Sequence, residues 1–231
     1  MNLFSLYDWQ PLLLTLRLAA CTTALLLVFG IPLAYWLAYS RSRLKPLFEA
    51  LLSMPLVLPP SVLGFYLLLA FSPQSALGHW LGSTFDLRLV FSFSGLVVGS
   101  VIFSVPFMVQ PIQVGLQQIP FQLIEASRSL GKSDLTTLWR VLLPNCKSAL
   151  LTGIVLSFAH TIGEFGVVLM IGGNIPGVTK VASIAIYDEV EKLNYSAAHF
   201  YSLVLISVSF LVLLTVFLVR RRNPSLSFPE V

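Results

Sequence analysis

Long stretches without a charged residue constrain the fold of this chain more than any other feature of its sequence. Asp, Glu, Lys and Arg are absent from residues 18–40, 50–85, 89–124 and 193–219, and Glu164 alone interrupts a fifth apolar stretch at 148–179. Each stretch exceeds the roughly 20 apolar residues with which an α-helix crosses about 30 Å of hydrocarbon. We therefore expect an all-α integral membrane protein with five to six transmembrane helices.

The composition argues against a soluble fold. Only 10% of the 231 residues are charged, whereas soluble domains carry roughly 25% charged residues. A soluble core would have to hold five membrane-length apolar segments in one small chain. No soluble domain is expected at either end, so residues 10–218 are predicted to form a single transmembrane domain.

The basic residues predict the orientation in the membrane. If the chain crosses five times, four of the 14 Lys and Arg residues fall on one side, namely Arg17, Arg88, Lys180 and Lys192. The other side receives Arg41, Arg43, Lys45, Arg128, Lys132, Arg140, Lys147 and Arg220 to Arg222. The positive-inside rule then places the N-terminus outside and the C-terminus in the cytoplasm. The net charge of +4 follows from this topology and does not indicate nucleic-acid binding.

The apolar stretches predict helices at about 12–39, 47–71, 91–116, from 146 onward, and at 197–219. Prolines at 55, 59, 60, 106 and 111 remove backbone donors, so the second and third helices should face protein or water. The fourth helix should end in the turn-forming residues 172–177. Whether a sixth or re-entrant segment lies near 165–192 is left open by the sequence.

The basic segment between the third and fourth helices, about 117–145, is predicted to be a helix–turn–helix on the cytoplasmic face. Pro120 suits the first position of a helix, and Gly131 suits the left-handed residue just after its end. Ser133 is expected to cap a second helix that ends at Pro144. Its apolar residues recur with helical spacing and predict one apolar stripe, formed by Leu135, Leu138, Trp139 and Leu142.

This segment resembles the EAA loop of ABC importer permeases. Glu125-Ala126-Ser127, then Gly131, then Val141 to Pro144 reproduce the spacing of that motif, with Ser127 and Val141 as mild departures. The resemblance implies a coupling helix that docks onto a cytoplasmic ATP-binding cassette ATPase. The docking residues would be Glu125, Ala126, Ser127, Gly131, Leu143 and Pro144.

The resemblance extends over residues 10–218 and is most specific to molybdate permeases. Residues 54–60 resemble the second-helix motif of that family, and 163–166 with 173–177 resemble the exit of the fourth helix in molybdate, tungstate and sulfate permeases. The short chain favours molybdate over sulfate or thiosulfate. The type I ABC importer fold is implied, in a bacterial or archaeal cytoplasmic membrane.

The same resemblance implies the partners. They are the ATPase subunits, an external oxyanion-binding protein that is periplasmic or lipid-anchored, a second permease copy in a homodimer, and membrane lipid. It implies no catalytic residue, no cofactor and no bound metal in this chain. Specificity for the anion would reside in the external protein.

Four polar residues within the apolar stretches are predicted to form a gate or to line the pathway. They are Ser100, Ser104, His160 and Glu164. His160 and Glu164 are four residues apart, so on one continuous helix they would share a face and pair. His160 stands where the permeases that this chain resembles often have Arg. A structural polar pair, a gate element and direct substrate binding are the three alternatives.

Other functional classes fit the sequence less well. A secondary transporter would show inverted repeats with helices broken at matching positions, and a membrane enzyme would need clustered acidic or His residues. The three His residues at 79, 160 and 199 are scattered. Residues 126–133 approximate a phosphate-binding loop, but such a loop follows a buried strand, and a helix is predicted there. We expect no ATP site in this chain.

Overall fold

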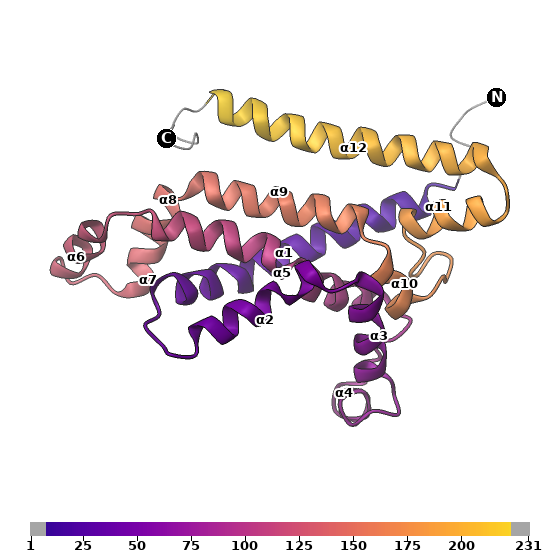
Figure 1. Cartoon of the computed structure of the whole chain (residues 1–231), viewed down its shortest axis with the longest axis horizontal. Coiled ribbons are helices and arrows are strands. Elements are labelled where there is room, and N and C mark those ends of the chain that lie inside the picture. Colours follow the sequence, from indigo (N-terminus) through magenta and orange to yellow (C-terminus); the bar gives the residue numbers. More distant parts are fainter. Residues whose placement is uncertain (1–7, 223–231) are drawn as a thin grey trace.

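The structure, a computed structural model, describes residues 8–222, with the backbone alone for residues 216 and 219–222. Within that range the chain forms helices and no strand, which confirms the all-α expectation. The long helices α1 (Gln10–Tyr39), α5 (Phe93–Gln117), α9 (Lys147–Gly163) and α12 (Tyr195–Arg222) run along the long axis of the molecule (Figure 1). The short helices α6 to α8 lie at one end, and α10 and α11 lie at the other.

The number of possible spans agrees with the sequence. Helices α1 and α5 and the Tyr195–Thr215 part of α12 are long and apolar enough to cross a membrane. Two bent pairs of helices raise the number to five, namely α2 (Lys45–Val57) with α3 (Pro60–Phe71), and Asp134–Asn145 with α9. Between 165 and 192 the helices are only α10 (Gly166–Gly172) and α11 (Ala182–Glu191). Both are too short to span a bilayer.

The prediction of one continuous helix at 47–71 is wrong. The chain breaks at Leu58 and Pro59, and α3 leaves α2 at an angle of 113°. Leu58 and Pro59 are both extended, with ψ of 136° and 134°. The physical reason is the Pro59-Pro60 pair, since each proline lacks a donor and disfavours helical backbone at the residue before it.

Helices α1, α5 and α9 enclose the main core, which holds Leu26, Leu37, Met108, Ile112 and Leu142. Glycine permits the close approach of α5 and α9. A Cβ atom on Gly115 would lie 2.3 Å from the Ala149 Cβ atom, which is closer than real atoms come. The α5–α9 contact is therefore tightly packed and resists any larger side chain.

Helices α2, α3 and α4 (Ala76–Phe85) are much less covered. Each buries a single residue, namely Pro55, Gly64 or Gly78, although their sequences are strongly apolar. Helices α3 and α4 project sideways from the bundle (Figure 1). Exposed apolar surface of this extent marks an interface with lipid or with another protein.

Candidate functional site

The predicted helix–turn–helix is present in residues 121–145. It comprises α6 (Phe121–Ser129), α7 (Asp134–Thr137), a π-helical turn (Leu138–Leu142) and α8 (Leu143–Asn145). Gly131 has a φ of +68°, and the Ser133 hydroxyl accepts a hydrogen bond from the Thr136 amide, so the expected left-handed residue and cap are confirmed. Pro120 is one residue off the prediction, because it precedes the helix that begins at Phe121.

The six residues expected to dock onto an ATPase divide into two groups. Glu125, Ala126, Gly131 and Pro144 are exposed, whereas Ser127 and Leu143 are buried. The Ser127 hydroxyl lies 2.8 Å from that of Thr137 and ties α6 to α7. The Ser127 hydroxyl therefore has its hydrogen-bond partner inside the segment and needs none from a docked protein.

The expectation of a single apolar stripe is wrong. Leu138 and Leu142 are buried, but Leu135 and Trp139 are 66% and 59% exposed. Leu138, Trp139 and Leu142 lie within the π-helical turn, in which the Leu143 amide is bonded to the Leu138 carbonyl. Pro144 has no amide hydrogen to continue the regular pattern, and a π turn changes the faces on which successive residues lie.

Three exposed apolar side chains beside the motif were missed from the sequence. Phe121, Leu123 and Leu130 are 51%, 41% and 75% exposed around α6. The buried side of α6 holds Ile124 and Ser127. The sequence could have indicated them, because all three lie away from the face of α6 that holds Ile124 and Ser127. Together with Glu125 and Ala126, they form an exposed surface.

The predicted gate residues lie mostly where α5 meets α9, which we call the α5–α9 seam (Ser100, Ser104, His160, Thr161 and Glu164). Ser104 Oγ lies 3.0 Å from His160 Nδ1 and 3.2 Å from Thr161 Oγ1. The imidazole also stacks on the Phe107 ring at 4.0 Å between centroids. Ser100 and Ser104 are fully buried and line no open passage in this structure, and Ser104 links α5 to α9 through its two partners.

The expected pairing of His160 with Glu164 is wrong. Helix α9 ends at Gly163, and Glu164 is extended with ψ of 131°, so the two side chains share no helical face. The Ser183 hydroxyl donates to the Glu164 carbonyl oxygen at 2.6 Å. The Ser100 hydroxyl faces the carboxyl group, yet within residues 8–222 neither group has a hydrogen-bond partner of ordinary geometry.

A second polar cluster, which we call the amide face (Glu49, Ser53, Gln110 and Gln113), lies between α2 and α5. Gln110 Nε2 donates to Ser53 Oγ at 3.0 Å, and Gln113 Nε2 donates to Glu49 Oε1 at 2.7 Å. These four residues border a hollow of about 170 Å³. The sequence reasoning missed them, although two glutamines three residues apart in a charge-free stretch were the available signal.

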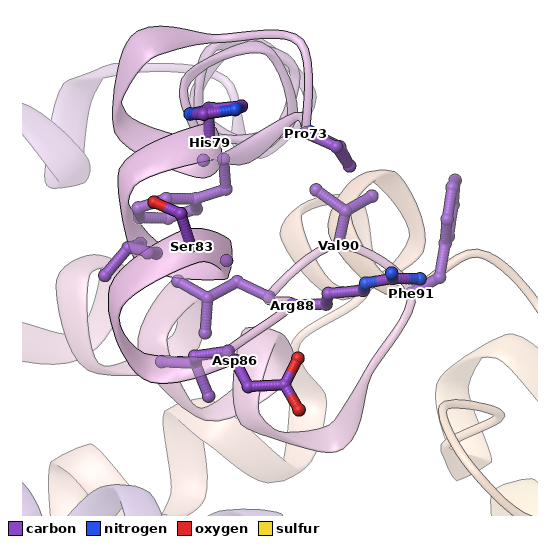
Figure 2. A pocket seen from close by; sticks show the side chains of 13 residues that line it. Pro73, His79, Ser83, Asp86, Arg88, Val90 and Phe91 are labelled. Carbon is purple, nitrogen blue, oxygen red and sulfur yellow. The ribbon is translucent and has the colours of Figure 1, made fainter.

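A larger hollow of about 590 Å³ lies on the projecting part of the molecule. His79 and Ser83 of α4 and Asp86 and Arg88 of the following segment border it (Figure 2). In the part of the chain that the structure describes, no three His, Cys, Asp or Glu side chains gather as metal ligands do. The hollow is bordered by the end of α3, by α4 and by the segment that follows α4, and its walls are both polar and apolar.

Comparisons with known proteins agree on the family. The family described as "Binding-protein-dependent transport system inner membrane component" matches residues 30–225. The molybdenum transport system permease protein ModB of Azotobacter vinelandii is 44% identical over 221 residues, which cover 96% of this chain and 98% of that protein. ModB of Escherichia coli K12 is 33% identical, with 80% of each chain covered.

Two further relatives bear on specificity and fold. The sulfate transport system permease protein CysT of Escherichia coli K12 is 33% identical over 82% of this chain, but over only 68% of its own length. A chain from inward-facing structures of the MetNI methionine ABC transporter superposes with a TM-score of 0.72 at 17% identity, covering 96% of this chain and 99% of that one. The fold is that of the type I ABC importer transmembrane domain.

Proposed function

The chain belongs to the family of binding-protein-dependent transport system inner membrane components, and we propose that it carries molybdate across a bacterial or archaeal cytoplasmic membrane. It is the membrane-spanning permease subunit of an ATP-driven importer. The observation that supports molybdate is the 44% identity to a molybdenum permease over nearly the full length of both chains. Tungstate or sulfate is the alternative, since sulfate permeases match at 33%.

The coupling surface is formed by exposed residues of α6 and of the turn after it, namely Phe121, Leu123, Glu125, Ala126, Leu130 and Gly131. It lies at one end of the long axis (Figure 1), and a short helix with exposed apolar residues suits a groove in a partner protein. ATP hydrolysis then occurs in a separate ATPase subunit. The basic residues Arg128, Lys132 and Arg140 at the same end support a cytoplasmic location, with the N-terminus outside.

The active assembly is a homodimer of this chain in the lipid bilayer. In the described residues Ser100 and Ser104 are fully buried, so one copy offers no open passage at these two positions. The sparsely covered helices α3 and α4 supply an apolar surface for a second copy. The remaining apolar surface, including Ile206 and Phe210 of α12, faces lipid.

Anion selection is assigned to an external binding protein, which docks at the end that carries α10 and α11. None of the Lys and Arg side chains that the structure describes is buried, so we assign no strong oxyanion site to the bundle itself. Of the three alternatives for the α5–α9 seam, the structural one is favoured, in which Ser104 and His160 fix the packing of α5 against α9. Glu164 does not meet the substrate, because a carboxylate would repel an oxyanion.

An exchange of binding proteins tests this proposal. The permease is reconstituted with its ATPase and supplied in turn with a molybdate-binding protein and with a sulfate-binding protein that still docks. ATP-driven uptake should follow the binding protein. Molybdate selectivity that persists with the sulfate-binding protein would show that the permease itself discriminates. One permease per two ATPases in the purified complex would contradict the homodimer.

A further inference from the structure

The amide face is polar but lies on a membrane-spanning helix, where lipid hydrocarbon cannot form hydrogen bonds with it. Gln110 and Gln113 are within α5, whose charge-free stretch crosses the membrane. Both side chains are half-buried, so part of each amide is open to whatever lies beyond α5. Polar groups that meet lipid without a partner cost several kcal/mol each. The amide face therefore meets water or protein.

The opposite surface of the molecule shows what lipid contact looks like in this chain. Helix α12 exposes Leu203, Ile206 and Phe210 at 55%, 66% and 62%. Its hydroxyls at Ser207 and Thr215 donate back to carbonyls of their own helix and so are satisfied locally. The glutamines of the amide face have no such local bond, because each donates across to another helix.

Helix α2 covers the amide face but is weakly attached to it. Only Pro55 is buried among its 13 residues. Its polar links to α5 are the bonds from Gln110 to Ser53 and from Gln113 to Glu49. A helix with so little buried apolar surface opens at low cost, and its displacement frees an N–H on each glutamine.

We propose that Gln110 and Gln113 line the cytoplasmic half of the anion pathway and donate hydrogen bonds to the passing oxyanion when α2 moves away. The proposal rests on the permease function given above. An anion can pass only if each site along its pathway binds it weakly enough to release it. Neutral amides meet this requirement, because they donate hydrogen bonds to a tetrahedral oxyanion without the strong attraction of a charged group. Glu49 belongs to α2 and moves away with it, and its charge is paired with that of Lys45, whose Nζ lies 3.8 Å from Glu49 Oε1.

Thiol labelling tests the proposal on the assembled permease–ATPase complex. Cys21 and Cys146 are not bonded, and both are first replaced by Ala. Gln110→Cys and Gln113→Cys are then compared with Ile206→Cys on α12 as a matched control. A small charged thiol reagent should modify the first two at least about tenfold faster than the control, because only thiols in contact with water ionise readily. Molybdate supplied with its binding protein and ATP should change their labelling rate.

Two outcomes separate this inference from the proposed function. Labelling of both glutamine positions no faster than of Ile206→Cys, in a complex that transports molybdate, overturns the pathway assignment alone. A parent complex that shows no ATP-driven anion uptake overturns the proposed function, whatever the labelling.

As a second measurement, Gln110→Glu should lower uptake at least about tenfold by placing a negative charge beside the anion, while Gln110→Asn should retain most of the uptake. Equal uptake by both variants contradicts the proposal.

Discussion

Helix α5 carries two polar surfaces that differ in how they are enclosed. Toward α9, Ser104 is fully buried and bonded to both His160 and Thr161. Toward α2, Gln110 and Gln113 are half-buried and each makes one bond to a weakly covered helix. Both surfaces lie in the same transmembrane helix, so the difference arises from the helix packed against each one.

The difference in enclosure suggests different functions for the uncharged polar groups of the α5–α9 seam and of the amide face. The α5–α9 contact includes positions such as Gly115, where any side chain would collide with Ala149. Polar groups enclosed there stabilise one arrangement of helices. The amide face is enclosed only by α2, which buries Pro55 alone. We therefore expect mutations in the α5–α9 seam to affect folding, and mutations in the amide face to affect transport.

The largest expected effect is that of Ser104→Leu. The larger side chain overfills a closed site, and the loss of the hydroxyl leaves His160 Nδ1 without its partner, so stability should fall by about 3 kcal/mol or more. Thermal unfolding of the purified permease in detergent measures this. Ser104→Ala is the control that removes the bonds without adding bulk, and it should lose less. A loss for Gln110→Leu as large as that for Ser104→Leu would remove the distinction between the two surfaces.

Gly131→Leu is expected to have an intermediate effect, on coupling instead of folding. Apart from its two neighbours in the described chain, nothing lies within 4 Å of a Cβ built at Gly131, whose φ is +68°, so the bundle should form normally. The strained backbone costs about 1–2 kcal/mol, and the added bulk separates the docked ATPase, so uptake should fall by about tenfold. Gly131→Asn is the control, since Asn tolerates left-handed backbone. Normal uptake with normal ATPase stimulation in Gly131→Leu contradicts the coupling assignment.

The smallest expected effect concerns Asp188, outside the membrane-spanning helices. Burial alone would raise the pKa of this carboxyl, but hydrogen bonds from Lys180 and Asn174 outweigh burial and lower the pKa. Its stabilising contribution is therefore complete above the ordinary Asp pKa of about 3.9 and is lost as pH falls through the lowered value. Asp188→Asn should reduce stability at neutral pH by about 1 kcal/mol or less.

The pH dependence provides the check on Asp188. Unfolding midpoints of the native chain and of Asp188→Asn, measured from about pH 7 to about pH 3, should converge at the acid end. A constant difference over that range would mean that the Asp188 charge contributes nothing, and that only the shape of the side chain matters.

The fold was largely predictable from the sequence, because charge-free stretches and cap residues act locally. Gly131 and Ser133 have the predicted roles in residues 121–145. The break at Pro59 was missed because the apolar pattern continues through it, while the backbone is decided by two adjacent prolines.

The candidate site was less predictable, because it depends on which helices meet. Glu164 was identified as the only charged residue in its stretch, but its partner was assigned on the assumption that α9 continues past Gly163. Gln110 and Gln113 were overlooked because neutral amides leave a stretch free of charge. Their bonds to α2 cross more than fifty residues of sequence, and no local pattern contains that information.

The most direct test of the central claim locks each polar surface of α5 in turn. Ser53→Cys with Gln110→Cys, and separately Ser104→Cys with Thr161→Cys, are joined by a short bifunctional thiol reagent in the reconstituted complex lacking Cys21 and Cys146. We predict that the first cross-link abolishes ATP-driven molybdate uptake until it is cleaved, because α2 must leave the amide face. The second should leave uptake intact, because the α5–α9 seam stays closed. Full uptake with α2 locked, or loss of uptake only when α9 is locked, would contradict the account.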